Sequence, residues 1–230
     1  MYANSKGLKY LHGVEVYLTA ALEPKQRDNY HTILIAKNFE GVKEINTLVD
    51  LSTQPDHMYY KPRITFDEFF NISDNVIKIS ACLASPLNKY PNFIGKLVDE
   101  KIAELEKNKE TEANKLYAEL NSEAAKEAWI EDYAAIYNTS YEIYVEQCIE
   151  KSNNAFDLQI EEAKSELENA KIVYDKLMKT YDYYEIQPHV KSMDQIRYNK
   201  MLYEASKKYN KPLIAGTDTH SIDSYKAECR

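Results

Sequence analysis

The sequence is poor in cysteine, glycine and proline, and it has no long apolar run. Its 230 residues include three cysteines, five glycines and seven prolines. The cysteines are widely spaced and odd in number, and no CxxC pair suggests structural zinc, which favours a reducing compartment over a disulfide framework. No apolar run approaches the length of a membrane span, and the N-terminus lacks the apolar segment of a signal peptide. We therefore expect a soluble, cytoplasmic protein without membrane contacts.

An excess of basic residues is also absent. The chain has 29 Lys and Arg against 37 Asp and Glu, for a formal net charge of −8. A broad face that grips nucleic acid through its phosphates usually makes a domain basic, so the composition argues against that mode of binding. It leaves open a small contact with a phosphodiester through a bridging metal ion. With 44% hydrophobic residues, the chain can bury a core, as one domain with an elaboration or as two small domains.

Glycine is nearly absent and proline is absent from residues 92–182, where Glu, Lys, Ala and Leu dominate. This composition is typical of long helices. Apolar residues recur there in alternating steps of three and four, which predicts a helix packed against a partner helix: Ile160, Ala163, Leu167, Ala170, Tyr174 and Leu177. We expect two or more antiparallel helices with turns near residues 138–140 and 152–154. Aromatic residues in this stretch are expected to pack rather than to stack on bases: Trp129, Tyr133, Tyr137, Tyr141 and Tyr144.

The flanking regions alternate short apolar strands with amphipathic helices, which predicts an α/β fold. Strand, helix and strand in residues 184–215 imply parallel pairing of the two strands. The expected strands cover residues 14–17, 32–36, 75–80, 184–189 and 212–215, and the expected helices cover residues 38–52 and 193–209. We therefore divide the chain into residues 1–91, a helical insertion at 92–182, and residues 183–230.

Residues with metal-binding chemistry lie in or beside these strands. Asp218 and His220 follow the last strand in PLIAGTDTH, where an Asp and a His two positions apart can point the same way toward one metal ion. Glu15 lies inside the first strand, His31 begins the second, and Cys82 follows the third. Each also has an ordinary structural interpretation. Glu15 would be an exposed carboxylate, His31 a polar residue at the start of a strand, and Cys82 a small apolar side chain that fills space. Asp218 and His220 would be two ordinary loop residues.

Three further polar positions carry weaker expectations. Lys61 and Arg63 flank Pro62, so both lie in an extended segment where they can meet phosphate oxygens, although a solvated loop is the alternative. His189 ends a predicted strand and can lie at the same end of the fold as Asp218. His57 lies in a polar loop and is expected at the surface.

Several segments, in this order, resemble the PHP domain of bacterial DNA polymerase III α subunits: GVEVYL, YHTILIAKNFEGVKEINTLVDLS, YYKPRI, KISACLAS, YYEIQPH and KKYNKPLIAGTDTH. The resemblance covers roughly residues 7–91 and 183–230. It implies a partial, distorted β/α barrel, and the long helical hairpin or bundle predicted for residues 92–182 is an insertion that the resemblance leaves unmatched. It also implies divalent metal ions (Zn, Mn or Mg) at the barrel mouth. Active members of the family hydrolyse phosphodiesters, which in DNA replication means 3′→5′ exonuclease activity, whereas others serve as structural platforms.

The resemblance also assigns roles to individual residues. Glu15 matches the Glu of the family's GxE strand, His31 the His before the next strand, and Cys82 the ligand after a Ser-Gly-Cys turn. Asp218 and His220 match the terminal Asp-x-His. All five are expected metal ligands, and Glu15, Asp218 and His220 are expected to be catalytic.

Arg63 and His189 match no ligand of the family, and we expect them to contact the phosphate of the substrate. The family's opening His-x-His motif and its following Asp-His motif have no counterpart in these residues. We therefore expect catalysis only when an N-terminal PHP portion completes the site, with a DNA 3′ end as substrate and other parts of a replicative polymerase as partners. Two alternatives stay open: an inert structural or interaction module, and a free-standing PHP phosphoesterase of the histidinol-phosphatase type.

Overall fold

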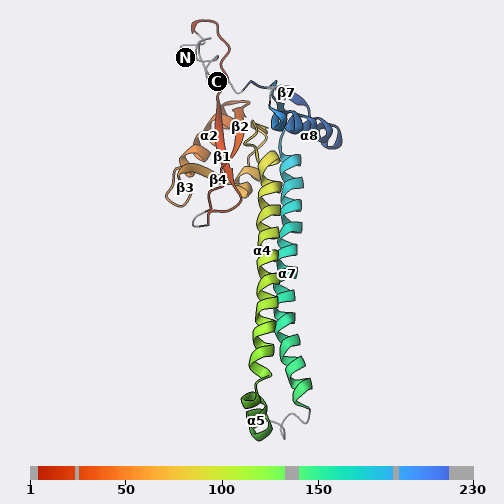
Figure 1. The fold of residues 1–230 in the computed structure, drawn as a ribbon. Helices are drawn as coiled ribbons and strands as arrows, with labels where there is room; N and C mark the ends of the chain where they lie inside the picture. Colours follow the sequence, from red (N-terminus) through yellow and green to blue (C-terminus); the bar gives the residue numbers. More distant parts are fainter. Residues whose placement is uncertain (1–4, 24–25, 133–139, 189–191, 218–230) are drawn as a thin grey trace. The chain divides into compact units, whose positions relative to one another are not determined.

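The computed structural model describes residues 5–23, 26–132, 140–188 and 192–217 (Figure 1). It divides the chain into two compact units. Unit 1 comprises residues 1–92 and 172–230, and unit 2 comprises residues 93–171. No helix in the described ranges is long and apolar enough to cross a membrane.

Unit 1 is built on a mixed sheet. Among the described residues, five strands pair in the order β3-β4-β1-β2-β5, and two more form a parallel pair, β6-β7. An isolated parallel bridge between Ile79 and Tyr183 connects the end of β5 with the start of β6. The strands are β1 (Gly13–Thr19), β2 (Tyr30–Ala36), β3 (Met58–Tyr59), β4 (Lys61–Thr65), β5 (Val76–Ile79), β6 (Tyr184–Ile186) and β7 (Leu213–Ala215). The α/β class predicted from the sequence is confirmed.

Strand direction decides which residues share an edge of the sheet. β2 is antiparallel to both β1 and β5, whereas β4 is parallel to β1 and β7 is parallel to β6. The start of β2 therefore lies at the same edge as the carboxyl ends of β1, β4 and β5.

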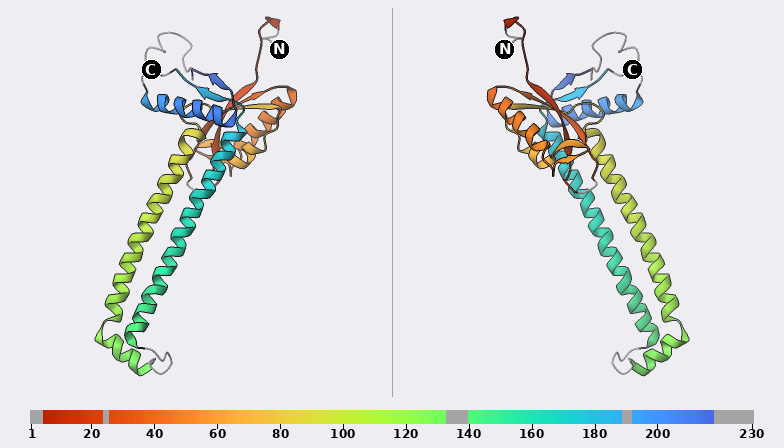
Figure 2. Two further views of the ribbon diagram at one scale, coloured as in Figure 1. Left: turned by 90° about the vertical axis from the view of Figure 1, so that its right-hand side faces the viewer. Right: turned by 90° about the vertical axis from the view of Figure 1, so that its left-hand side faces the viewer.

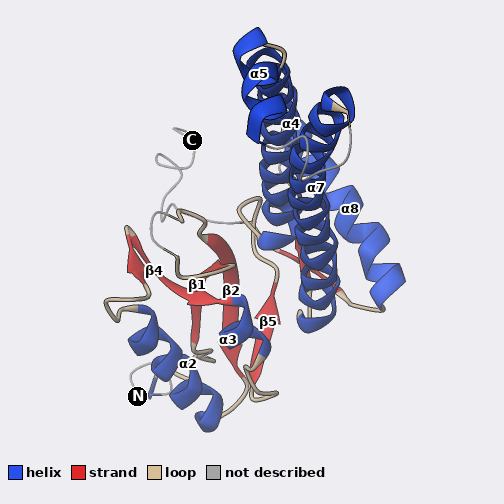
Figure 3. Ribbon diagram, turned by 90° about the horizontal axis from the view of Figure 1, so that it is seen from below, coloured by secondary structure: helices blue, strands red, loops and turns tan. Residues whose placement is uncertain are grey.

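Two helices cover one face of this sheet, as Figure 3 shows: α2 (Phe39–Ser52) and α3 (Phe66–Phe70). The Asn38 side chain caps α2 by accepting a hydrogen bond from the Gly41 amide. The core on this side consists of apolar side chains from strands and helices: Val16, Leu18, Tyr30, Leu34, Ile45, Ile64, Phe66 and Phe69. Because side chains alternate along a strand, Glu15 and Tyr17 lie on the opposite face from Val16 and Leu18.

His57 is buried, which corrects the expectation of a surface histidine. It is 5% exposed, and its two ring nitrogens lie 2.8 Å from carboxylate oxygens of Asp56 and Glu68. Glu68 is fixed because it forms a capping box with Thr65 at the start of α3. A polar partner at each ring nitrogen offsets the cost of burying the imidazole.

Long helices dominate the rest of the chain: α4 (Pro86–Leu120), α5 (Glu123–Asp132), α7 (Tyr141–Thr180) and α8 (Met193–Tyr209). Figure 2 shows α4 and α7 side by side in unit 2. Two ion pairs, Lys101 with Glu166 and Lys109 with Asp157, show that the two helices run antiparallel there. The predicted seam is confirmed in unit 2, where Ile160, Ala163 and Ala170 are buried.

The turn predicted at residues 152–154 is wrong, because these residues lie inside α7. Apolar or half-buried positions continue through the segment, from Val145 and Ile149 to Phe156 and Ile160. Packing along this stripe outweighs the weak helix preference of Ser and Asn. The turn expected at residues 138–140 falls largely outside the described residues.

An aromatic cluster packs between α5 and the start of α7. Trp129, Tyr141 and Val145 are buried together, with Tyr144 against them, and the ring centroids of Trp129 and Tyr141 are 5.5 Å apart. The packing role predicted for these aromatic residues is confirmed. Tyr133 and Tyr137 lie outside the described residues.

Candidate metal centre

Three of the predicted ligands, Glu15, His31 and Cys82, come together at one edge of the sheet. Glu15 Oε1 lies 3.1 Å from His31 Nδ1, and Cys82 Sγ lies 3.7 Å from the same ring nitrogen. The side chains of His31 and Glu15 are 28% and 38% exposed. The structure thus joins a carboxylate, an imidazole and a thiol from three separate segments at a position that solvent reaches.

Strand register explains the contact between Glu15 and His31. Tyr17 on β1 is directly opposite His31 on β2, so Glu15 is the diagonal neighbour on the same face. The rings of Tyr17 and His31 have centroids 4.9 Å apart. Sequence reasoning missed Tyr17, although its position two residues after Glu15 on one strand was sufficient to place it on this face.

The turn after β5 brings Cys82 to the same place. Ala81 has a φ of 58°, in the left-handed region that favours glycine, and it turns the chain immediately before Cys82. The His31 amide then donates to the Ala84 carbonyl at 3.0 Å, which ties the turn to the start of β2. The Ser85 amide donates to the Cys82 carbonyl at 3.0 Å, so the turn has its own internal hydrogen bond.

The donor atoms suit a divalent metal ion. Carboxylate oxygen, imidazole nitrogen and thiolate sulfur are all established ligand types for zinc, and the first two also suit manganese. However, the described residues contain no group of three or more His, Cys, Asp or Glu side chains arranged to hold a metal ion. Asp218 and His220, the two remaining predicted ligands, and His189 lie outside the described residues. The part of the site that the structure describes is therefore a partial ligand set centred on His31.

Arg63 is 2% exposed and points into the protein. Its Nη1 donates to the Gln26 carbonyl at 2.8 Å and lies 3.8 Å from Oδ1 of Asp28, which is equally buried. Asp28 also accepts hydrogen bonds from the Thr19 hydroxyl and the Ala20 amide. These contacts indicate a structural role for Arg63 rather than the predicted contact with substrate.

Lys61, two residues before Arg63 in β4, is exposed, and its Nζ lies 5.1 Å from the centre of the Tyr17 ring. It is thus the cation of the Lys-Pro-Arg segment that faces the candidate site. Sequence reasoning missed Asp28, because residues 20–29 have no periodic pattern that would predict a buried position.

Comparison with protein families identifies the class of protein to which this fold belongs. The family model of the PHP domain matches residues 1–146, so the chain belongs to the PHP family. The match includes residues 93–146 of unit 2, which the sequence motifs had left unmatched.

The curated relatives are named DNA polymerase III subunit alpha. The protein from Borreliella burgdorferi is 37% identical over 87 residues, which cover 35% of this chain and 8% of the relative. The protein from Aquifex aeolicus is 28% identical over 131 residues, which cover 51% of this chain and 11% of the relative. The chain thus corresponds to a small part of each relative, and the predicted resemblance to the PHP region of these subunits is confirmed.

Proposed function

We propose that this chain acts as a PHP segment of a replicative DNA polymerase III α subunit and takes part in metal-dependent hydrolysis of phosphodiesters at a DNA 3′ end. The observation that supports it most directly is the convergence of Glu15 and Cys82 on the Nδ1 atom of His31 in a chain of the PHP family. Asp218 and His220 join this centre in the proposal, because the strand that precedes them, β7, is parallel to β6.

A bound divalent ion would supply Lewis acidity that neutralises charge developing on the phosphate oxygens. The residues that would hold it are Glu15, His31 and Cys82, with Asp218 and His220. Glu15 would also orient the His31 ring through the contact at Nδ1. Lys61 would bind a phosphate oxygen beside the ion, because its ammonium group is exposed next to Tyr17.

A second candidate function is an inert platform within the polymerase. It is favoured by one observation: the described residues contain no group of three or more His, Cys, Asp or Glu side chains arranged to hold a metal ion. In this case the three side chains stabilise the edge of the sheet, and unit 2 docks a partner.

Release of nucleotides from a 3′-ended single-stranded DNA in manganese tests the proposal, with the chain assayed together with an N-terminal PHP portion that supplies the His-x-His and Asp-His motifs. We expect wild-type activity to fall about 100-fold in Glu15→Gln and in His31→Gln, because loss of a ligand or its orienting group weakens metal binding and activity by about 10- to 100-fold. Glu40→Gln is the matched control, since Glu40 is an exposed carboxylate on α2. Activity equal in all variants would place the hydrolysis elsewhere, and a wild-type chain that binds metal without releasing nucleotide would favour the platform.

A further inference from the structure

A row of aromatic rings and positive charges crosses the five-stranded sheet on the face opposite α2 and α3. Tyr59 on β3 is directly opposite Lys61 on β4. Arg63, two residues further along β4, is directly opposite Tyr17 on β1. Paired residues share a face, so these side chains lie on one surface of the sheet. The row continues to His31 on β2, whose ring lies 4.9 Å from that of Tyr17, and it therefore ends at the candidate metal centre.

Cations lie over the rings at two points of this surface. Lys61 Nζ is 5.1 Å from the centre of the Tyr17 ring, and Arg27 Cζ is 5.2 Å from the centre of the Tyr60 ring. The rings of Tyr59 and Tyr60 are 4.8 Å apart, which joins the Arg27 end to the rest. Lys61 and Arg27 are both exposed, and neither forms an ion pair within the described ranges. We refer to Arg27, Tyr60, Tyr59, Lys61 and Tyr17 together as the tyrosine row.

Tyr60 is presented to solvent at a conformational cost. It is the single residue between β3 and β4, its φ is 58°, and it is 77% exposed. A left-handed φ is rare for a bulky residue, and glycine or asparagine fits such a turn better. Burial does not offset this cost, because most of the side chain is in water. An aromatic residue that is held in a strained turn and left in solvent points to a ligand that stacks on it.

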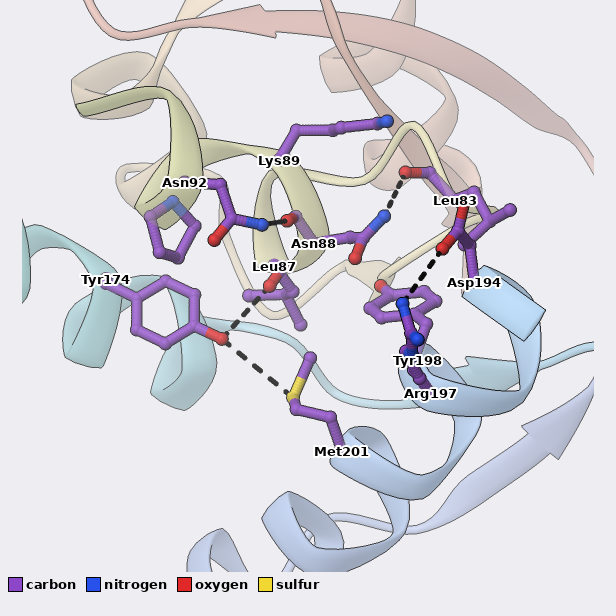
Figure 4. Close-up of a pocket in the computed structure, with 11 residues that line it drawn as sticks. Leu83, Leu87, Asn88, Lys89, Asn92, Tyr174, Asp194, Arg197, Tyr198 and Met201 are labelled. Carbon is purple, nitrogen blue, oxygen red and sulfur yellow. Dashed lines mark hydrogen bonds and ion pairs between the residues drawn. The ribbon is translucent and has the colours of Figure 1, made fainter. Parts of the chain in front are cut away.

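Comparable side chains elsewhere in unit 1 already have partners within the protein. Lys43 lies over the ring of Phe39, four residues away on α2, but its Nζ also pairs with a glutamate of the same helix at 2.9 Å. At the cavity of about 530 Å³ shown in Figure 4, Arg197 pairs with Asp194 at 3.6 Å, and the Tyr174 hydroxyl donates to a backbone carbonyl at 3.0 Å. The cations of the tyrosine row differ, because they have no carboxylate partner among the described residues.

Rings beside cations suit single-stranded nucleic acid. Bases stack on aromatic side chains, and phosphates pair with Lys and Arg. From β3 to β2 the sheet has three inter-strand spacings, or about 14 Å, which matches about four stacked nucleotides. A contact with so few phosphates needs only a few cations, so it is compatible with the net charge of −8 of the chain.

We propose that the tyrosine row binds single-stranded DNA and leads it toward the candidate metal centre. A base would stack on Tyr60, and phosphates would meet Arg27 and Lys61 on the way to His31. The inference rests on the proposed function for the identity of the nucleic acid, and it adds the surface along which the strand lies.

Fluorescence anisotropy of a labelled oligothymidylate of about ten nucleotides, titrated with the full chain in EDTA, tests this inference. Tyr60→Asn replaces the ring with a residue that tolerates the left-handed turn, so binding should weaken about tenfold without a lower midpoint of thermal unfolding. Arg27→Gln and Lys61→Gln should each reduce the salt dependence, the slope of log K against log salt, by about 0.7, the value for one phosphate contact. Phe39→Ala and Lys43→Gln are the matched controls and should leave binding unchanged, because they remove a ring and a cation from α2 on the opposite face.

Other outcomes overturn the inference. Unchanged binding in Tyr60→Asn, or equal binding of the same strand annealed to its complement, means that no base stacks on the row. An unchanged salt dependence in both Arg27→Gln and Lys61→Gln places the phosphates elsewhere. Equal competition by polyglutamate means that the row recognises negative charge rather than nucleic acid, and a wild-type chain that does not bind the strand contradicts the proposal directly.

The test separates the tyrosine row from the proposed hydrolysis, because EDTA removes metal ions. A chain that binds the strand as expected but releases no nucleotide contradicts only the proposed hydrolysis. A chain that releases nucleotide while Tyr60→Asn and the charge variants bind normally contradicts only the tyrosine row.

Discussion

Unit 1 buries polar and charged side chains, whereas the described residues of unit 2 bury apolar ones. The buried polar residues of the described chain all belong to unit 1: Thr19, Thr32, Ser52, His57, Arg63, Lys78, Ser80, Ser85, Glu185, Gln187 and Gln195. Buried polar groups cost free energy unless they are paired, so a unit that keeps so many is built around specific hydrogen bonds. The described residues of the candidate metal centre lie in that unit.

Unit 2 keeps its charges on the outside. Its inter-helix pairs, Lys101 with Glu166 and Lys109 with Asp157, are largely exposed, and exposed pairs contribute little to stability. The seam of buried residues such as Ile160 and Ala163 therefore carries most of its stability. The comparison teaches that, among the described residues, the candidate metal ligands lie in unit 1, whereas the buried seam of unit 2 is apolar.

The largest expected effect comes from breaking the buried pair of unit 1. Arg63→Met leaves the Asp28 carboxylate buried without its cation, which should destabilise the protein by about 3 kcal/mol. Urea unfolding followed by circular dichroism measures the loss. Lys61→Met, at the exposed position two residues earlier in β4, should change stability by less than about 0.5 kcal/mol. Equal losses of stability from Arg63→Met and Lys61→Met would contradict the claim that the buried pair of Arg63 and Asp28 stabilises unit 1.

Shortening a seam residue should break unit 2 by itself. Ile160→Ala removes a buried side chain and should destabilise unit 2 by about 2 kcal/mol. Hydrogen exchange should quicken at amides of residues 93–171 and stay unchanged in β1, β2 and β5. Leu158→Ala is the control, because Leu158 is 68% exposed on the same helix. Faster exchange throughout both units would show that they unfold together and would contradict the division.

The buried histidine of unit 1 predicts a pH dependence. Burial alone would lower the pKa of His57, but the hydrogen bonds and charges of Asp56 and Glu68 outweigh it and raise this pKa above its usual 6.5. The stability contributed by protonated His57 is therefore fully present below pH 6.5 and is lost as the pH rises through the folded-state pKa.

The pH dependence is measured as the difference in unfolding free energy between wild type and His57→Gln. It should shrink as the pH rises above 6.5. At the acidic end, burial would raise the pKa of Glu68, but hydrogen bonds from His57 and Thr65 outweigh it and lower this pKa, and the hydrogen bond with His57 lowers the pKa of Asp56 against a smaller opposing effect of desolvation. Their contribution is therefore lost as the pH falls through those lowered values. A difference that grows from neutral to alkaline pH would contradict the assignment.

The smallest expected effect concerns the surface of unit 2. A double-mutant cycle with Lys101→Gln and Glu166→Gln should give a coupling below about 0.5 kcal/mol, because both side chains are about half exposed. The coupling should fall further at high salt. A coupling as large as the effect of Arg63→Met would mean that charges, rather than the seam, stabilise unit 2.

Sequence patterns predicted the helices that are determined by residues close together in the chain. The helix at 193–209 and the capped helix at 38–52 follow from apolar periodicity and end signals, and the structure has both. What these patterns could not predict depends on pairing between distant segments. His31 reaches the site because β2 runs antiparallel to β1, and nothing near residue 31 in the chain specifies that direction.

Burial of polar residues was also hidden from the sequence. Asp28 and Arg63 are buried because the segment before β2 folds over the end of β4, and His57 because Glu68 is positioned by the cap of α3. These contacts produce no periodic pattern in the sequence from which the burial could be predicted. The roles of Asp218, His220 and His189 stay predictions from the family resemblance.

Titration of the full chain with cobalt(II), followed by near-ultraviolet absorption, tests the proposed metal centre most directly. The band that arises when a thiolate binds cobalt reports on Cys82 itself. We expect this band in wild type, its loss in Cys82→Ser, and its weakening in His31→Gln and Asp218→Asn. The band should persist in Cys148→Ser and Cys229→Ser, which control for the other two thiols. A wild-type chain without the band, or a band that survives Cys82→Ser, would contradict the metal centre.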